Sequence, residues 1–136
     1  DNFVLMGHFE KLTELNKCYN IADIVVDGSG GESWSLPSFH MAGLGKKAVV
    51  HLNSGIKEWA NENNSWIVNS SGKISADDGI FFDKNSPFNA GNIYDFEEEE
   101  MVKQINNALK SKNKKNDLTN EFSYEKMATK LLENIL

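Results

Sequence analysis

The sequence predicts an α/β fold: a Rossmann-like parallel sheet flanked by helices, with a long helix at the C-terminal end. Short apolar segments with the length of buried strands alternate with segments whose apolar residues recur at helical spacing. A run of small residues, 27–31, also follows one of these strands and precedes a helix. In an open α/β sheet, ligands bind outside the carboxyl ends of the strands. We therefore expect residues 23–50 to hold the functional site.

The composition limits the ligands that the chain can bind. At 136 residues the chain has room for one domain, and its net charge of −6 argues against a nucleic-acid partner. All basic residues are lysines, so a phosphate site lacks the bidentate arginine clamp and depends on lysines, backbone amides and helix dipoles. The single cysteine and the absence of a long apolar run favour a cytoplasmic protein with no transmembrane segment.

The first half of the chain reads as strand–helix–strand–helix–strand. The expected strands are 3–6, 23–26 and 48–52, and the first expected helix is 9–19. The second helix, ended by Gly45, is expected to bury its apolar residues Leu36, Phe39, Ala42 and Leu44. This alternation predicts a parallel sheet.

The second half is expected to add a short helix at 56–61 and a brief strand at 66–68. Residues 69–95 are predicted to form one irregular loop, packed down by Ile80, Phe81, Phe82 and Phe88. Asp95 and Glu98 have the spacing of a capping box, which predicts a helix to about residue 112.

The buried face of this helix is predicted to consist of Met101, Val102, Ile105 and Leu109. A polar linker follows at 113–119, mostly facing solvent. Ser123 is expected to cap a last helix whose apolar stripe needs a surface to cover.

Several ordered segments resemble one known family. Val4-Leu5-Met6-Gly7 is similar to its Val-x-Phe-Leu-Gly strand, and residues 19–23 to its Tyr-x-x-Ala-Asp helix end. Residues 32–36, Glu-Ser-Trp-Ser-Leu, stand where the family has Glu-Gly-Phe-Gly-Leu. Residues 54–58, Ser-Gly-Ile-Lys-Glu, stand where it has Gly-Gly-Ile-Pro-Glu. Residues 122–125 are similar to its Phe-Ser-Trp-Glu. The chain thus resembles the C-terminal nucleotide-sugar-binding domain of retaining GT-B glycosyltransferases of the group 1 type.

This resemblance implies the transfer of a sugar, with retention, from a nucleotide diphosphate sugar such as a UDP or GDP sugar. Glu32 matches the carboxylate that contacts the donor sugar and is the expected catalytic residue. The donor-binding residues would be Ser29, Gly30, Gly31, Glu32, Ser33, Trp34, Ser35, Leu36 and His40. The family needs no metal or other cofactor, and the sequence shows no metal-ligand cluster.

Two departures concern the donor. His40 stands where the second Glu of the family's Glu-x7-Glu motif holds the ribose, and imidazole is not the same bidentate acceptor. Ser33 and Ser35 replace two glycines, so their hydroxyls can replace some amide contacts. Neither the base nor the sugar of the donor follows from the sequence.

Each candidate residue also has a structural interpretation. Glu32 could cap the following helix, His40 could be a satisfied structural group, and Trp34 could be a core anchor instead of a stacking platform. His8 and His51 stand at the carboxyl ends of predicted strands and are candidate cleft residues. Glu58 either braces its short helix or contacts the ligand.

In the family, two further strand–helix units and an acceptor-binding N-terminal domain precede the matching region. In the strand order 3-2-1-4-5-6, the expected strands 3–6 and 23–26 would not be neighbours. We therefore expect residues 1–136 to be part of a donor-binding domain that a further domain or a complementing chain completes. Any membrane contact would be made through that missing part. The alternative is a non-catalytic Rossmann-like module that binds a nucleotide or a protein.

Overall fold

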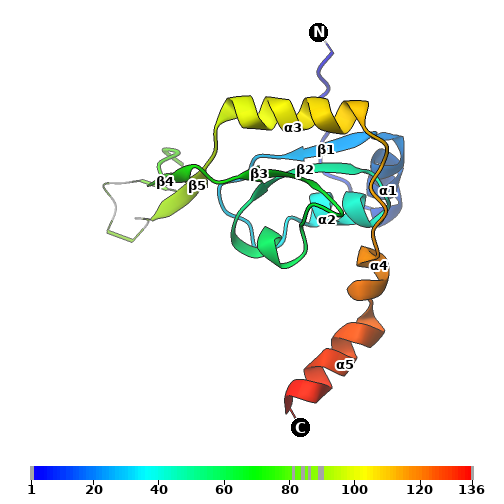
Figure 1. Cartoon of the computed structure of the whole chain (residues 1–136). Helices are drawn as coiled ribbons and strands as arrows, with labels where there is room; N and C mark the ends of the chain where they lie inside the picture. The colour runs from blue at the N-terminus through cyan, green and yellow to red at the C-terminus, as the bar shows by residue number, and fades with distance from the viewer. Residues whose placement is uncertain (1, 81, 84, 86, 89–90, 136) are drawn as a thin grey trace.

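The structure is a computed structural model that describes residues 2–80, 82–83, 85, 87–88 and 91–135. Its centre is a parallel sheet in which β1 (Ile24–Asp27), β2 (Lys47–Leu52) and β3 (Trp66–Asn69) lie side by side in chain order (Figure 1). Val26 pairs with Val49, and Val50 with Ile67. The predicted α/β fold with a parallel sheet is confirmed, and the carboxyl ends of all three strands meet at one edge.

Helices cover both faces of this sheet. On one face, α3 (Glu98–Lys110) contacts all three strands; on the other, α2 (Leu36–Gly43) contacts β1 and β2 (Figure 1). The central strand serves both layers, because successive side chains of a strand point to opposite faces. Ala48 and Val50 are buried on the α2 side, and Val49 is buried on the α3 side. This explains why the middle of β2, residues 48–50, is apolar.

The predicted strand at 3–6 does not form. These residues have no strand structure, and Leu5 is 85 % exposed. An extended segment becomes a strand only when another strand satisfies its backbone groups, and no strand of the described chain pairs with it. The next element, α1 (Leu12–Ile21), confirms the helix predicted at 9–19 with a shift of about one turn.

Residues 69–95 are not one irregular loop. They contain an antiparallel hairpin of β4 (Gly72–Ser75) and β5 (Asn92–Asp95), in which Lys73 faces Tyr94. The expected apolar anchors do not pack down: Ile80 is 81 % and Phe88 is 92 % exposed, and Phe82 is also exposed. Phe81 lies outside the described residues. Local pattern missed the hairpin because its strands are short and lie far apart in sequence.

The capping of α3 was also predicted wrongly. Asp95 is the last residue of β5, and Glu97 occupies the N-cap position without a side-chain hydrogen bond. The helix buries Met101 and Ala108, while the predicted core residues Val102 and Leu109 are more than half exposed. The same correction applies to α2, whose buried residues are Ser38, Met41 and Ala42 while Leu36 and Leu44 are exposed.

The segment expected as a solvent-facing linker at 113–119 is a strap held against the body. The Asn113 and Asn116 side-chain amides donate to the carbonyls of Gly45 and Ala42, at the carboxyl end of α2. Lys114 Nζ donates to the carbonyls of Glu62 and Ser65, and burial lowers its pKa. The strap ends in α4 (Leu118–Glu121), whose Leu118 is fully buried.

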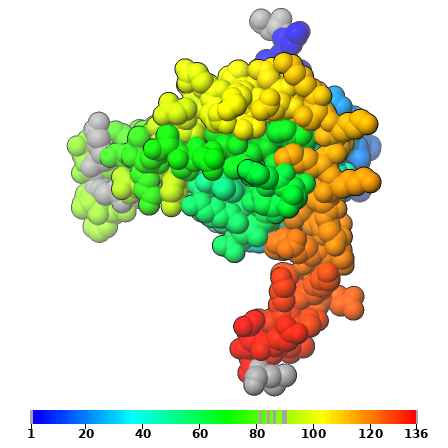
Figure 2. Space-filling model, viewed as in Figure 1, coloured from blue at the N-terminus to red at the C-terminus, as the bar shows by residue number. Residues whose placement is uncertain are grey.

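The last helix, α5 (Tyr124–Ile135), extends away from the body (Figures 1 and 2). Ser123 caps it as predicted, with its Oγ accepting a hydrogen bond from Lys126 N at 3.3 Å. None of its residues is buried, so the apolar stripe remains exposed. Among the described residues, no helix combines the length and the apolarity that crossing a bilayer requires.

Candidate functional site at the carboxyl ends of the strands

Asp27, the last residue of β1, organises the loop that follows it. One carboxylate oxygen accepts a hydrogen bond from Ser29 N at 2.9 Å. The other accepts from the hydroxyls of Ser35 and Ser38, at the beginning of α2. A single carboxylate thus fixes both ends of the loop, with three donors satisfying a charge at the sheet edge.

A second loop, after β2, packs directly against the first. Gly55 N donates to the Glu32 carbonyl at 3.0 Å. A Cβ atom on Gly55 would collide with the carbonyl oxygen of Ser33. Only glycine fits this contact. We call the two loops, residues 27–35 and 53–58, the carboxyl-edge site.

Each loop also holds one serine in the left-handed region of backbone space. Ser35 has φ 54° and Ser54 has φ 41°. L-residues other than glycine rarely adopt this conformation, which costs about 1–3 kcal/mol. At Ser35, the hydrogen bond to Asp27 and the bond from Phe39 N to its carbonyl help to hold the conformation.

His51 lies beneath these loops and does not line a cleft. Its side chain is completely buried, with Nδ1 donating to the Ser29 carbonyl at 3.0 Å and Nε2 2.9 Å from Ser70 Oγ. Its ring also packs at 4.8 Å from that of Phe96. The expectation that His51 faces a cleft is wrong, because its two nitrogens join the loop after β1 to the end of β3.

Asn53 completes this inner layer. Its side-chain amide donates to the carbonyls of Ser29 and His51, at 2.7 and 3.1 Å. Its Oδ1 is buried and has no hydrogen-bond partner in the structure. A buried acceptor without a partner is costly, so this oxygen marks a position for a water molecule or a ligand donor.

The hairpin closes one side of the first loop. Tyr94 N donates to the Gly30 carbonyl at 2.8 Å, and a Cβ on Gly30 would lie 2.9 Å from the Tyr94 carbonyl. Gly30 therefore allows close approach of β5. Gly31, by contrast, has no atom within 4 Å of the position of a Cβ.

The open part of the loop is the stretch from Gly31 to Ser33. Both of these residues are exposed, and Glu32 between them is half-buried. Within the described chain, no hydrogen bond or ion pair holds the Glu32 carboxylate. It does not cap α2, whose N-cap is Ser35. Glu32 is thus placed where its carboxylate can reach a ligand.

The beginning of α2 lacks one of the backbone N–H groups that the first turn of a helix usually offers. Leu36 is 57 % exposed at the first helical position, next to the open part of the loop. Pro37 follows it and has no N–H group. An anion at this helix end therefore finds no donor at Pro37 and depends on the amides of the preceding residues.

Trp34 is a core anchor and not a stacking platform. Its ring packs edge to face against Phe39 and Phe122, with centroids 5.6 and 5.4 Å apart. Its carbonyl accepts a hydrogen bond from Trp59 Nε1 at 2.8 Å. The structural interpretation of Trp34 holds, and this aromatic cluster joins the loop to η1 (Ser54–Glu58) and α4.

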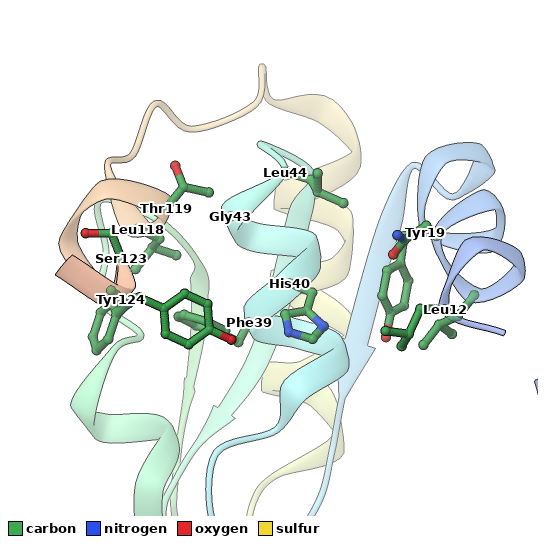
Figure 3. Close-up of a pocket in the computed structure, with 13 residues that line it drawn as sticks. Leu12, Tyr19, Phe39, His40, Gly43, Leu44, Leu118, Thr119, Ser123 and Tyr124 are labelled. Atoms are coloured by element: carbon green, nitrogen blue, oxygen red, sulfur yellow. The ribbon is translucent and has the colours of Figure 1, made fainter. Parts of the chain in front are cut away.

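His40 lies on a different surface from the open loop. It is exposed and faces Tyr19 across a groove between α1, α2, α4 and the beginning of α5, with ring centroids 6.1 Å apart (Figure 3). This helical groove has a volume of about 610 Å³ and is mainly apolar; its lining includes Leu12, Leu15, Phe39, Leu44 and Phe122. Burial, and then the neighbouring Cys18, raise the pKa of Tyr19.

Two candidates remain, His8 and Glu58, and only Glu58 belongs to the carboxyl-edge site. His8 is exposed in the segment that forms no strand, so the expectation that it ends a strand is wrong. Glu58 is exposed at the end of η1. Among the described residues, no three metal-ligating side chains come together.

Sequence reasoning missed the residues that hold the site in shape, above all Asp27, Asn53 and Tyr94. Asp27 and Asn53 carried a readable signal, since each is a polar residue immediately after a buried strand. Tyr94 had no local signal, because its contact with Gly30 crosses 64 positions of the sequence.

In comparisons with known proteins, no family model matches the sequence, and no curated protein is similar enough to be identified as a relative.

Proposed function

We propose that residues 1–136 form the donor-binding part of a retaining GT-B glycosyltransferase that transfers a sugar from a nucleotide diphosphate sugar. The observation that carries the proposal is the backbone at the family's glycine positions. Ser35 and Ser54 stand where the family has glycine, and both have positive φ. Gly55 stands at a third glycine position and tolerates no Cβ. At these three positions the backbone has a conformation or a close contact for which glycine is suited, whereas Ser33, at a fourth glycine position, does not have positive φ.

The sheet order supports the same proposal. Strands β1, β2 and β3 are parallel neighbours in chain order, as strands 4, 5 and 6 are in the doubly wound order 3-2-1-4-5-6. Under this proposal, the outer edge of β1 pairs with a strand that comes from another part of the enzyme or from a complementing chain. That part also supplies the acceptor site.

The residues would divide the chemistry as follows. The Glu32 carboxylate accepts hydrogen bonds from hydroxyls of the donor sugar, and the amides of the open loop bind the diphosphate. In the reaction, the bond between the anomeric carbon and the diphosphate oxygen breaks, the oxygen of the acceptor hydroxyl bonds to that carbon, and the hydroxyl proton passes to the leaving diphosphate. The site contributes positioning and stabilisation of the leaving diphosphate.

A second candidate function is a non-catalytic module that binds a nucleotide or a protein. The helical groove favours it, because His40 faces Tyr19 in an apolar surface at the position of the family's ribose-binding Glu. The two candidates differ in what Glu32 does. Only the glycosyltransferase requires its carboxylate.

Thermal unfolding with UDP, GDP, ADP and their sugars tests the proposal. We expect one nucleotide sugar to stabilise the chain, by about 2.7 kcal/mol at a concentration one hundred times its Kd. Glu32→Ala should abolish this stabilisation, and Glu14→Ala, an exposed carboxylate on α1, should retain it. Stabilisation that is equal in Glu32→Ala and wild type, or a cooperative transition that no nucleotide sugar shifts, would contradict the proposal.

A further inference from the structure

Two lysines from different elements meet on one aromatic ring beside the carboxyl-edge site. Lys57 Nζ in η1 lies 5.3 Å from the centroid of the Tyr94 ring, and Lys73 Nζ in β4 lies 4.7 Å from it. Both lysines are exposed, and Tyr94 is half-buried. The ring thus gathers two ammonium groups that are 16 residues apart in sequence.

This cluster is fixed to both loops of the site. Tyr94 donates its backbone N–H to the Gly30 carbonyl, and the two backbones lie so close that a Cβ on Gly30 would be 2.9 Å from the Tyr94 carbonyl oxygen. Lys57 follows Gly55, whose own contact with Ser33 is equally tight. The hairpin lies beside the carboxyl ends of the parallel strands (Figure 1). The two ammonium groups are therefore held next to the open loop, not on a remote surface.

The charges of the pair are not balanced within the described chain. The two distances place the ammonium groups no more than about 10 Å apart, the screening length at 0.1 M salt. Neither forms an ion pair with a carboxylate of the described residues. The chain as a whole carries a net charge of −6, and the two lysines without an ion pair form a local positive charge on this acidic protein. A bound anion would relieve their mutual repulsion.

The two lysine ammonium groups indicate which kind of anion would bind. In a chain without arginine, lysine ammonium groups are the cations available to bind phosphate, and each acts as a point charge with three donors. Two such charges suit a group with several negative oxygens, such as a diphosphate. The resemblance assigns no role to Lys73 or Tyr94, because residues 69–95 lie outside it.

We propose that Lys57, Lys73 and Tyr94 form a phosphate-binding site beside the open loop. The two ammonium groups donate to phosphate oxygens, and the Tyr94 ring holds the lysine side chains in place. This proposal rests on the proposed function, under which the phosphate belongs to the nucleotide diphosphate sugar. A free phosphate or an anionic acceptor would present the same chemistry, and the experiment separates these sources.

Calorimetric titration with inorganic pyrophosphate, UDP and uridine tests the site. The double variant Lys57→Gln/Lys73→Gln should bind pyrophosphate and UDP about tenfold more weakly than wild type, and its affinity should depend less on salt. The control Lys17→Gln/Lys110→Gln removes the same charge from exposed positions on α1 and α3, and should bind within about twofold of wild type. All four lysines are exposed, so unfolding curves of both variants should match that of wild type.

The outcomes separate this site from the donor proposal. Equal pyrophosphate affinity in the double variant and wild type, or no binding to wild type at millimolar concentration, would overturn the lysine site. The nucleotide-sugar stabilisation that depends on Glu32 could still stand. If pyrophosphate binds through the lysines but UDP, or the GDP or ADP that matches the stabilising nucleotide sugar, binds no more tightly than its nucleoside, the phosphate comes from another source than the donor. In that case the lysine site stands and its link to the donor is wrong.

Discussion

The two loops of the carboxyl-edge site are fixed by other segments of the chain, whereas none of the residues of α5 is buried. Gly55 is pressed against Ser33, and Gly30 against Tyr94. In α5, the apolar residues Leu131 and Ile135 are 61 % and 69 % exposed. Figure 2 shows the helix extending from the body.

This difference shows at which positions packing within the chain limits the choice of residue. Replacing Gly30 or Gly55 changes a contact between two backbones, which cannot rearrange independently. In α5, an apolar side chain loses little when it is shortened, because it has few partners to lose. The strength of an amphipathic pattern therefore does not show whether its apolar face is buried.

The largest expected effect is that of Gly55→Ala. The new Cβ would collide with the Ser33 carbonyl, so one of the two loops must move. We expect a loss of about 4 kcal/mol in the free energy of unfolding, at the upper end of single substitutions, measured by urea denaturation.

Gly31→Ala is the matched control for this substitution. Gly31 has a negative φ and open space around the position of a Cβ, so its stability should stay within about 0.5 kcal/mol of wild type. Equal effects of the two substitutions would show that the loops are not packed as described.

The second prediction compares two leucines. Leu118, at the end of the strap, is 1 % exposed, and its replacement by alanine should cost about 3 kcal/mol through lost burial and a cavity. Leu131→Ala in α5 should change the free energy of unfolding by less than about 0.5 kcal/mol. Urea denaturation of the two variants measures the contrast. A cost at Leu131 as large as that at Leu118 would mean that α5 is covered in solution.

The smallest effect is expected at the beginning of α5. Ser123→Ala removes the acceptor for Lys126 N and should destabilise this helix by about 1 kcal/mol. Because α5 adds no buried residue, helical content by circular dichroism should fall while the unfolding midpoint of the body stays unchanged. Ser123→Asp should restore the helix, since aspartate also caps it. If Ser123→Ala shifts the unfolding midpoint of the body and Ser123→Asp does not, α5 contributes to the stability of the body, which would contradict this prediction.

Much of the fold could be predicted because its signals are local. Residues 48–50 are apolar and indicated a buried strand, and β2 is the central strand of the sheet. Gly45 was predicted to end a helix, and it adopts a φ of 75° directly after α2. The order of the helices and strands from α1 to β3 followed from such patterns.

The remainder depended on contacts between distant residues. The segment 3–6 has the composition of a strand but finds no strand to pair with among the described residues. The hairpin joins Lys73 to Tyr94, and neither segment alone has enough length to indicate a strand. In the strap, Asn113 and Asn116 have the composition of a linker. Their hydrogen bonds to the carbonyls at the end of α2 appear only in the tertiary structure.

The candidate site divides in the same way. The sequence alone indicated the edge of the sheet and the loop with Glu32, because residue type at these positions limits the backbone locally. Only the tertiary structure decided that His51 is buried, that Trp34 packs in the core, and that two lysines meet on Tyr94. The physical reason is that local pattern sets the direction of a side chain, whereas its surroundings come from segments far away in the sequence.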